Sequence, residues 1–168
     1  MKRVMLLLVI LFLIAAYSGY ATFEWRIEKE KIDIIKDYAT SLSDHPLLEI
    51  ADAGSMLEYL IKNNASGEIL RERIRRYSAS ARTLEYSSLI LYKATGDEKY
   101  LFFRTAMANL KDFFISVSNR PDCKIVLKEN LDIIKSIGKE LGKKRIIDLT
   151  KEEVEKILEL SAELGYTT

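Results

Sequence analysis

The chain has 168 residues, of which 26 are Lys or Arg and 25 are Asp or Glu, so its net charge is only +1. This balance argues against nucleic acid as a partner, since nucleic-acid-binding proteins favour a strongly basic surface. The single cysteine excludes an internal disulfide bond. The absence of glutamine and the many Lys, Glu and Ile residues are typical of proteins from thermophilic prokaryotes.

The chain begins with two basic residues, Lys2 and Arg3, and continues with thirteen apolar residues, Val4–Ala16. No charge follows before Glu24, so the uncharged run extends over twenty residues, Val4–Phe23. As a helix this run would measure about 30 Å, the thickness of the hydrocarbon core of a bilayer. Aromatic residues near its end are typical of a membrane interface. The sequence therefore predicts an N-terminal transmembrane or signal-anchor helix, whose characteristic residues are Val4, Leu8, Phe12, Tyr17, Tyr20 and Trp25.

A cleaved secretory signal peptide is the alternative interpretation of the same run. The apolar part has the length of a signal-peptide core, and small residues follow at spacings that a signal peptidase accepts. In both interpretations residues 1–23 engage the membrane and residues 24–168 form the remaining domain, with 24 Lys and Arg against 25 Asp and Glu. The basic start favours a cytoplasmic N-terminus and an extracytoplasmic domain, although further lysines and arginines follow the run closely.

The domain has the periodicity of amphipathic helices almost throughout, and its two prolines fall at apparent breaks. We expect the first helix to continue from the anchor and to stop at Ser43–Pro46, where Pro46 suits the first turn of a new helix. The expected helices cover residues 23–42, 47–62, 68–95, 98–117, 123–141 and 150–164. Short polar loops between them predict an all-α fold, an antiparallel bundle of about six helices built from αα-hairpins.

Several of these helices have an apolar side that indicates the core. The spacing over residues 68–95 and 98–117 alternates between three and four, as in a bundle interface. Gly96 is expected in the left-handed conformation with Asp97 as the next N-cap, and Thr150 is expected to begin a capping box. The expected apolar positions are Ile27, Ile34, Ile35, Tyr38 and Leu42 in the helix at 23–42; Leu70, Ile74, Tyr77, Ala81, Leu84, Ser88 and Leu91 in the helix at 68–95; and Phe103, Met107, Leu110, Phe114 and Val117 in the helix at 98–117.

The sequence offers little for catalysis or for a cofactor. His45 is the only histidine, and a zinc site would need ligands from distant segments. No phosphate-binding loop or Gly-x-Ser-x-Gly motif is present. Carboxylates at helical spacing, such as Glu49 and Asp52, alternate with basic residues as on a solvated surface. We therefore expect no enzyme, no metal and no cofactor, with Cys123 as a buried small apolar residue.

Arginines on the helix expected at 68–95 form the sharpest polar cluster. Arg71, Arg75 and Arg82 share one face beside the apolar seam, where they could receive an anion or an acidic partner. Glutamates stand three or four residues from these arginines and from Arg76, so the charges also suffice as local support for the helix. Both interpretations stay open.

One tripeptide in the loop expected at residues 63–67 matches an N-glycosylation sequon. Asn64-Ala65-Ser66 has the required Asn-x-Ser pattern. Its relevance requires an extracytoplasmic domain and a glycosylating host.

Taken together, these patterns predict a single-pass membrane-anchored, extracytoplasmic helical protein that acts as an accessory or scaffolding subunit. Its expected partners are the lipid bilayer and another membrane or envelope protein, because a tether raises the effective concentration of the domain toward such proteins. One alternative is a sensor-type bundle with a small-ligand cavity lined by Tyr77, Tyr92 and Phe103. A secreted enzyme that uses His45 or enclosed carboxylates is the other.

Overall fold

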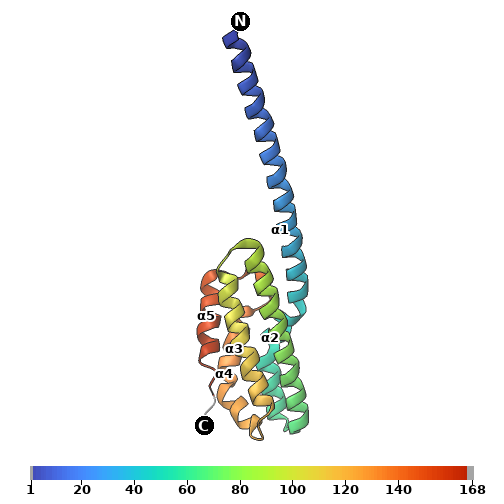
Figure 1. The fold of residues 1–168 in the computed structure, drawn as a ribbon. Helices are drawn as coiled ribbons and strands as arrows, with labels where there is room; N and C mark the ends of the chain where they lie inside the picture. Colours follow the sequence, from blue (N-terminus) through green and yellow to red (C-terminus); the bar gives the residue numbers. More distant parts are fainter. Residues whose placement is uncertain (1, 166–168) are drawn as a thin grey trace. The chain divides into compact units, whose positions relative to one another are not determined.

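The structure is a computed structural model that describes residues 2–165, without the side chains of residues 2–4 and 6–9. The described chain is helical and contains no strand (Figure 1). It divides into two compact units, one ending at Ile35 and the other beginning at Lys36. The predicted all-α class is confirmed. The elements are α1 (Lys2–Lys62), α2 (Gly67–Thr95), α3 (Lys99–Ser118), α4 (Cys123–Leu141), the short 3₁₀ helix η1 (Ile146–Asp148) and α5 (Lys151–Ala162).

The second unit is a helical bundle around one hydrophobic core (Figure 1). Residues 36–62 of α1 contribute one wall, α2 packs against α3, and α5 packs against both α3 and α4. The seams predicted for residues 70–91 and 103–117 are buried at every position, with Leu84 and Phe114 fully inaccessible. The bundle prediction is therefore confirmed, because the three-four spacing places one stripe of each helix toward its neighbours.

The predicted break at Ser43–Pro46 is wrong. Helix α1 continues through Pro46, so two expected helices are one, and the described residues form five α-helices rather than six. A proline inside a helix removes one N–H donor and usually kinks or breaks the helix. Here Ala39, Ser43 and Leu47 are buried in the bundle on both sides of the proline, and the Ser43 hydroxyl donates to the Ala39 carbonyl at 2.6 Å. Tertiary packing therefore holds the helix together.

The apolar side predicted for the first helix is not the side that packs. Tyr38 is 61 % exposed, and Ile27, Ile34, Ile35 and Leu42 are exposed as well. In the second unit the positions of α1 that face the core are occupied by smaller residues, among them Ala39 and Ser43, which the pattern of large apolar residues did not mark. Within the second unit, α1 thus has small residues on its buried side, and Tyr38 and Leu42 are exposed.

The predicted membrane anchor is the first part of α1. No helix among the described residues contains a stretch that is both long and apolar enough to cross a membrane. The anchor residues Val4 and Leu8 lie outside the described side chains. Along the rest of this part of the helix the aromatic anchor residues are exposed, namely Phe12, Tyr17, Tyr20 and Trp25. The transmembrane helix is therefore not confirmed and stays a prediction.

Of the local sequence signals at the helix ends, those at Gly96 and Thr150 are confirmed, and the N-cap expected at Asp97 is wrong by one residue. Gly96 ends α2 in the left-handed region, with φ at 69°. Asp97 is not itself the N-cap of α3, which is Glu98, but its carboxylate accepts a hydrogen bond from the Lys99 N–H at 3.0 Å. Thr150 forms the predicted capping box with Glu153 at the start of α5. The contacts that define these helix ends join residues only two or three positions apart. A short sequence pattern therefore includes both partners of each contact.

Replacing Thr150 by alanine should lower the free energy of unfolding by about 1 kcal/mol, because the Glu153 N–H loses its acceptor at the start of α5. Thr150→Ser retains the hydroxyl and should stay close to the parent protein. Urea denaturation of the two variants provides the measurement. Equal stability of the alanine and serine variants would show that the cap contributes nothing.

Candidate functional site

The close approach of α1 and α4 shapes the surface of the bundle. A Cβ atom added to Gly138 would lie 2.3 Å from the carbonyl oxygen of Ala51, and one added to Gly54 would lie 2.9 Å from the backbone nitrogen of Lys135. Both glycines are buried. The two helix backbones therefore touch where they cross, which is possible only because these positions carry no side chain.

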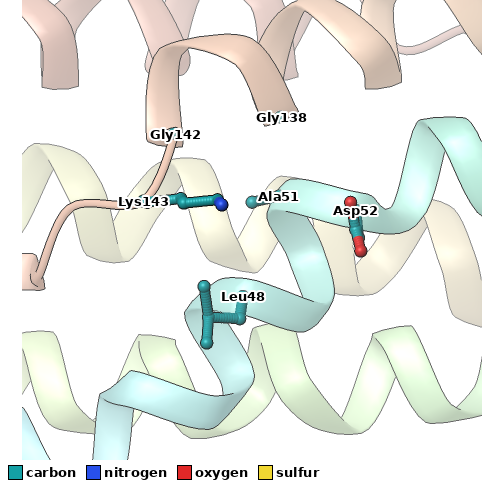
Figure 2. A pocket seen from close by; sticks show the side chains of 6 residues that line it. All are labelled: Leu48, Ala51, Asp52, Gly138, Gly142 and Lys143. Carbon is teal, nitrogen blue, oxygen red and sulfur yellow. The ribbon is translucent and has the colours of Figure 1, made fainter.

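An open hollow of about 380 Å³ lies beside this crossing (Figure 2). Helix α4 ends there at Leu141, and the residue that follows it, Gly142, has a left-handed φ of 55°. Figure 2 shows the Lys143 side chain extending toward Ala51, while Leu48 and Asp52 project from α1. The hollow is thus lined by one large apolar, one acidic and one basic side chain, together with Ala51 and two glycines.

A second hollow, of about 250 Å³, lies between α1 and α2. Leu48 and Asp52 line both hollows, so they form a ridge between them, and Leu48 is 52 % exposed. We call this region, with its two hollows, the Leu48 ridge. The second hollow is lined by His45, Leu48, Glu49, Asp52, Met56, Arg73 and Tyr77.

Glu49 is the centre of a polar cluster at the edge of the Leu48 ridge. The Arg76 guanidinium donates to its carboxylate at 2.5 Å, the Ser80 hydroxyl donates to its other oxygen, and His45 Nδ1 lies 3.9 Å away. Desolvation raises the pKa of Glu49, but the hydrogen bonds from Ser80 and Arg76 outweigh it, so the pKa lies below its ordinary value of 4.5. Glu49 is therefore a paired carboxylate that joins α1 to α2.

Replacing Glu49 by glutamine should lower the free energy of unfolding at neutral pH by about 1–2 kcal/mol, because two charge-assisted hydrogen bonds are weakened. A carboxylate with a lowered pKa stabilises the fold above its unfolded-state pKa, and the stabilisation is lost as the pH falls through the folded-state value. The difference between parent and variant should thus shrink below pH 4.5. Denaturant titrations at pH 7 and at acidic pH measure it. The exposed Glu159→Gln is the control, and a difference that does not vary with pH would contradict this role.

The same cluster bears on the enzyme alternative. Ser80, Glu49 and His45 are residue types of a hydrolytic triad, in which histidine must lie between the nucleophile and the acid. Here the hydroxyl of Ser80 donates to Glu49 instead, and the side chain of His45 is 74 % exposed. The described residues contain no group of three or more His, Cys, Asp and Glu side chains arranged to hold a metal ion. This cluster therefore has the geometry of a helix-helix contact.

The three predicted arginines lie along α2 without converging on one point. Arg71 donates to the Arg120 carbonyl at 3.4 Å, whereas Arg75 and Arg82 are exposed. Arg71 and Arg75 line an open hollow of about 570 Å³ together with Glu68 and Glu72. An interaction face at these arginines stays a prediction.

Two of the charges that were expected to pair within α2 form ion pairs with other helices. Arg76 pairs with Glu49 of α1, and Glu85 pairs with Lys111 of α3 at 2.9 Å. The hydrogen bond from Lys111 to Glu85 raises the pKa of the lysine, as expected for an ammonium group beside a carboxylate. These ion pairs hold the bundle together between helices and do not support α2 alone.

The residues proposed for an enclosed ligand cavity do not share one. Tyr77 lines the second hollow and packs its ring against Phe114, with the ring centroids 5.7 Å apart. Burial raises the pKa of Tyr77 to about 12. Phe103 is buried in the core, and Tyr92 lies fifteen residues beyond Tyr77 on α2, about 22 Å along the axis. The three side chains therefore cannot line a single small pocket.

Comparison of the chain with protein-family models, curated proteins and solved structures found no match. What the protein does must therefore be inferred from its own residues. Sequence reasoning missed three of the described features. They are the Leu48 ridge, the crossing of α1 and α4 at Gly54 and Gly138, and the polar cluster around Glu49. In the sequence, the one signal of the ridge is the pair of adjacent leucines, of which the structure buries Leu47 and exposes Leu48.

Proposed function

We propose that this chain is a single-pass membrane-anchored, extracytoplasmic helical protein that acts as an accessory or scaffolding subunit. The observation that carries the proposal is that the first part of α1 has exposed apolar side chains on all sides of the helix. Four consecutive large side chains, Leu11, Phe12, Leu13 and Ile14, are each between 57 and 73 % exposed. Successive residues of a helix point about 100° apart, so these four cover all of its sides. A surface helix of a water-soluble protein has a polar face, and this stretch has none.

The residues that follow support the position of the membrane interface. Tyr17, Tyr20, Phe23 and Trp25 are exposed at the end of the uncharged run, where amphipathic rings favour the level of the lipid headgroups. The Lys29 ammonium lies 5.4 Å from the centroid of the Trp25 ring, within reach of a cation–π contact. The apolar run is thus followed by the aromatic and basic residues that commonly flank a membrane helix.

The bundle supplies surfaces for contacts rather than a recognisable reaction centre. The Leu48 ridge offers an exposed leucine between two hollows, which suits the insertion of side chains from a partner. Arg71, Arg75 and Arg82 offer a second surface on α2, next to the exposed Glu68 and Glu72. An anchor would hold both surfaces near other membrane proteins and raise their effective concentration.

The experiment that tests this proposal is extraction of the native membranes, followed by intact-mass measurement and co-purification. The chain should stay in the membrane fraction after high-salt washing, require detergent for release, retain residues 1–21, and co-purify reproducibly with one membrane protein. Loss of residues 1–18 or 1–21 would replace the anchor by a cleaved signal peptide. A chain that washes off without detergent would contradict the proposal as a whole.

A further inference from the structure

The loop between α1 and α2 carries the Asn64-Ala65-Ser66 sequon on the surface of the bundle. Asn64 and Ser66 are both exposed. The backbone of Asn64 has φ at 52°, the only left-handed non-glycine residue in the described range. Asparagine tolerates this conformation better than most residues do. The acceptor residue of the sequon thus lies at the tip of a tight turn, clear of the helices on either side.

The hydrogen bonds of this loop leave the reactive groups of the sequon available. Lys124 donates to Asn64 Oδ1 at 3.1 Å, and no described acceptor receives the Nδ2 hydrogens. Ser66 Oγ accepts from the Ile69 N–H at 3.3 Å as the N-cap of α2, which leaves its own proton free to be donated. The neighbouring Asn63 is different, because its Nδ2 is already bound to the Tyr59 carbonyl at 2.8 Å.

We propose that Asn64 is a site of N-linked glycosylation. In this reaction Asn64 Nδ2 forms a bond to the anomeric carbon of a lipid-phosphate-linked oligosaccharide. The bond from that carbon to the phosphate oxygen breaks, the oxygen keeps the electron pair, and the amide loses one proton. The modified residue retains Oδ1 as an acceptor, so its bond to Lys124 survives. The inference rests on the proposed function, since it requires the bundle to face the compartment where the transfer occurs.

The matched variants follow from the contacts of the loop. Ser66→Asp destroys the sequon but keeps a good N-cap, and Ser66→Thr keeps both. Asn64→Asp removes the reactive nitrogen and keeps an oxygen for Lys124. Pro121→Thr creates a second sequon at the exposed Asn119, in the adjacent loop just before Lys124. These full-length chains would be produced in a host with an oligosaccharide transferase and analysed by intact mass, before and after digestion with an amide glycosidase.

The parent and Ser66→Thr chains are expected to carry a glycan that the glycosidase removes, leaving aspartate at position 64. Asn64→Asp and Ser66→Asp should lose the glycan completely. An unmodified Asn64 in a Pro121→Thr chain that carries glycan on Asn119 would overturn this inference and leave the proposed function standing. Absence of glycan from both positions would overturn the inference together with the proposed orientation of the bundle.

Discussion

Replacing Gly138 by alanine should lower the free energy of unfolding by about 3 kcal/mol, although alanine is the better helix former by about 1 kcal/mol. The new methyl group would meet the Ala51 carbonyl oxygen at 2.3 Å. That oxygen belongs to the backbone of α1 and cannot rotate away as a side chain would. The two helices must therefore separate, and the buried contacts around the crossing loosen.

The control for this prediction is Gly67→Ala at the start of α2. Its added Cβ would have the Arg71 guanidinium, 3.7 Å away, as its one close neighbour, so we expect no loss of stability. Gly54→Ala should resemble Gly138→Ala, because its methyl group would meet the Lys135 backbone. Chemical denaturation followed by circular dichroism measures all three. A Gly138→Ala chain as stable as the Gly67→Ala chain would show that the helices do not cross this closely.

Introducing lysine at both Leu11 and Ile14 should release the chain from the membrane fraction. These residues lie near the middle of the uncharged run. Each lysine at the centre of a membrane helix costs about 3 kcal/mol, so two should shift the partition toward the soluble fraction by roughly four orders of magnitude. The effect follows from the predicted anchor, because a chain held by the bundle alone would not respond to charges in this run.

The control variant places the same two charges on the exposed bundle positions Ser41 and Ser55. It should stay with the membrane like the parent chain. Fractionation by ultracentrifugation, with quantitative blotting of pellet and supernatant, gives the distribution. Retention of the Leu11→Lys/Ile14→Lys chain in the washed pellet would contradict an anchor at residues 4–23.

The core faces of α2 and α3 could be predicted because their signals are local and repeated. The seam from Leu70 to Leu91 contains seven positions that agree with one another, and every one is buried. Pro46 was misread because the same residue suits a first helical turn and, less often, a helix interior. The packing of Ala39 and Ser43 decides between them, and that packing depends on distant parts of the chain.

The candidate site could not be predicted, because its contacts join residues far apart in sequence. Glu49 binds Arg76 and Ser80, which are 27 and 31 residues away, and spacing within one helix assigned it to the solvated surface. Gly138 lies near the end of α4, and no other residue of that helix indicates a close contact at this position. Only the structure shows that the Ala51 backbone of α1 lies against Gly138, so that this position has no room for a side chain.

The Glu49 cluster also determines the register in which α1 and α2 pair. A seam with apolar residues every three or four positions resembles itself after one turn, so sliding by about 5.4 Å would keep many apolar contacts. The same slide would take the carboxylate, whose side chain is only 15 % exposed, away from Arg76 and Ser80. An unpaired carboxylate in that place is costly. The two contacts of Glu49 thus favour a single alignment among several that the apolar residues alone would allow.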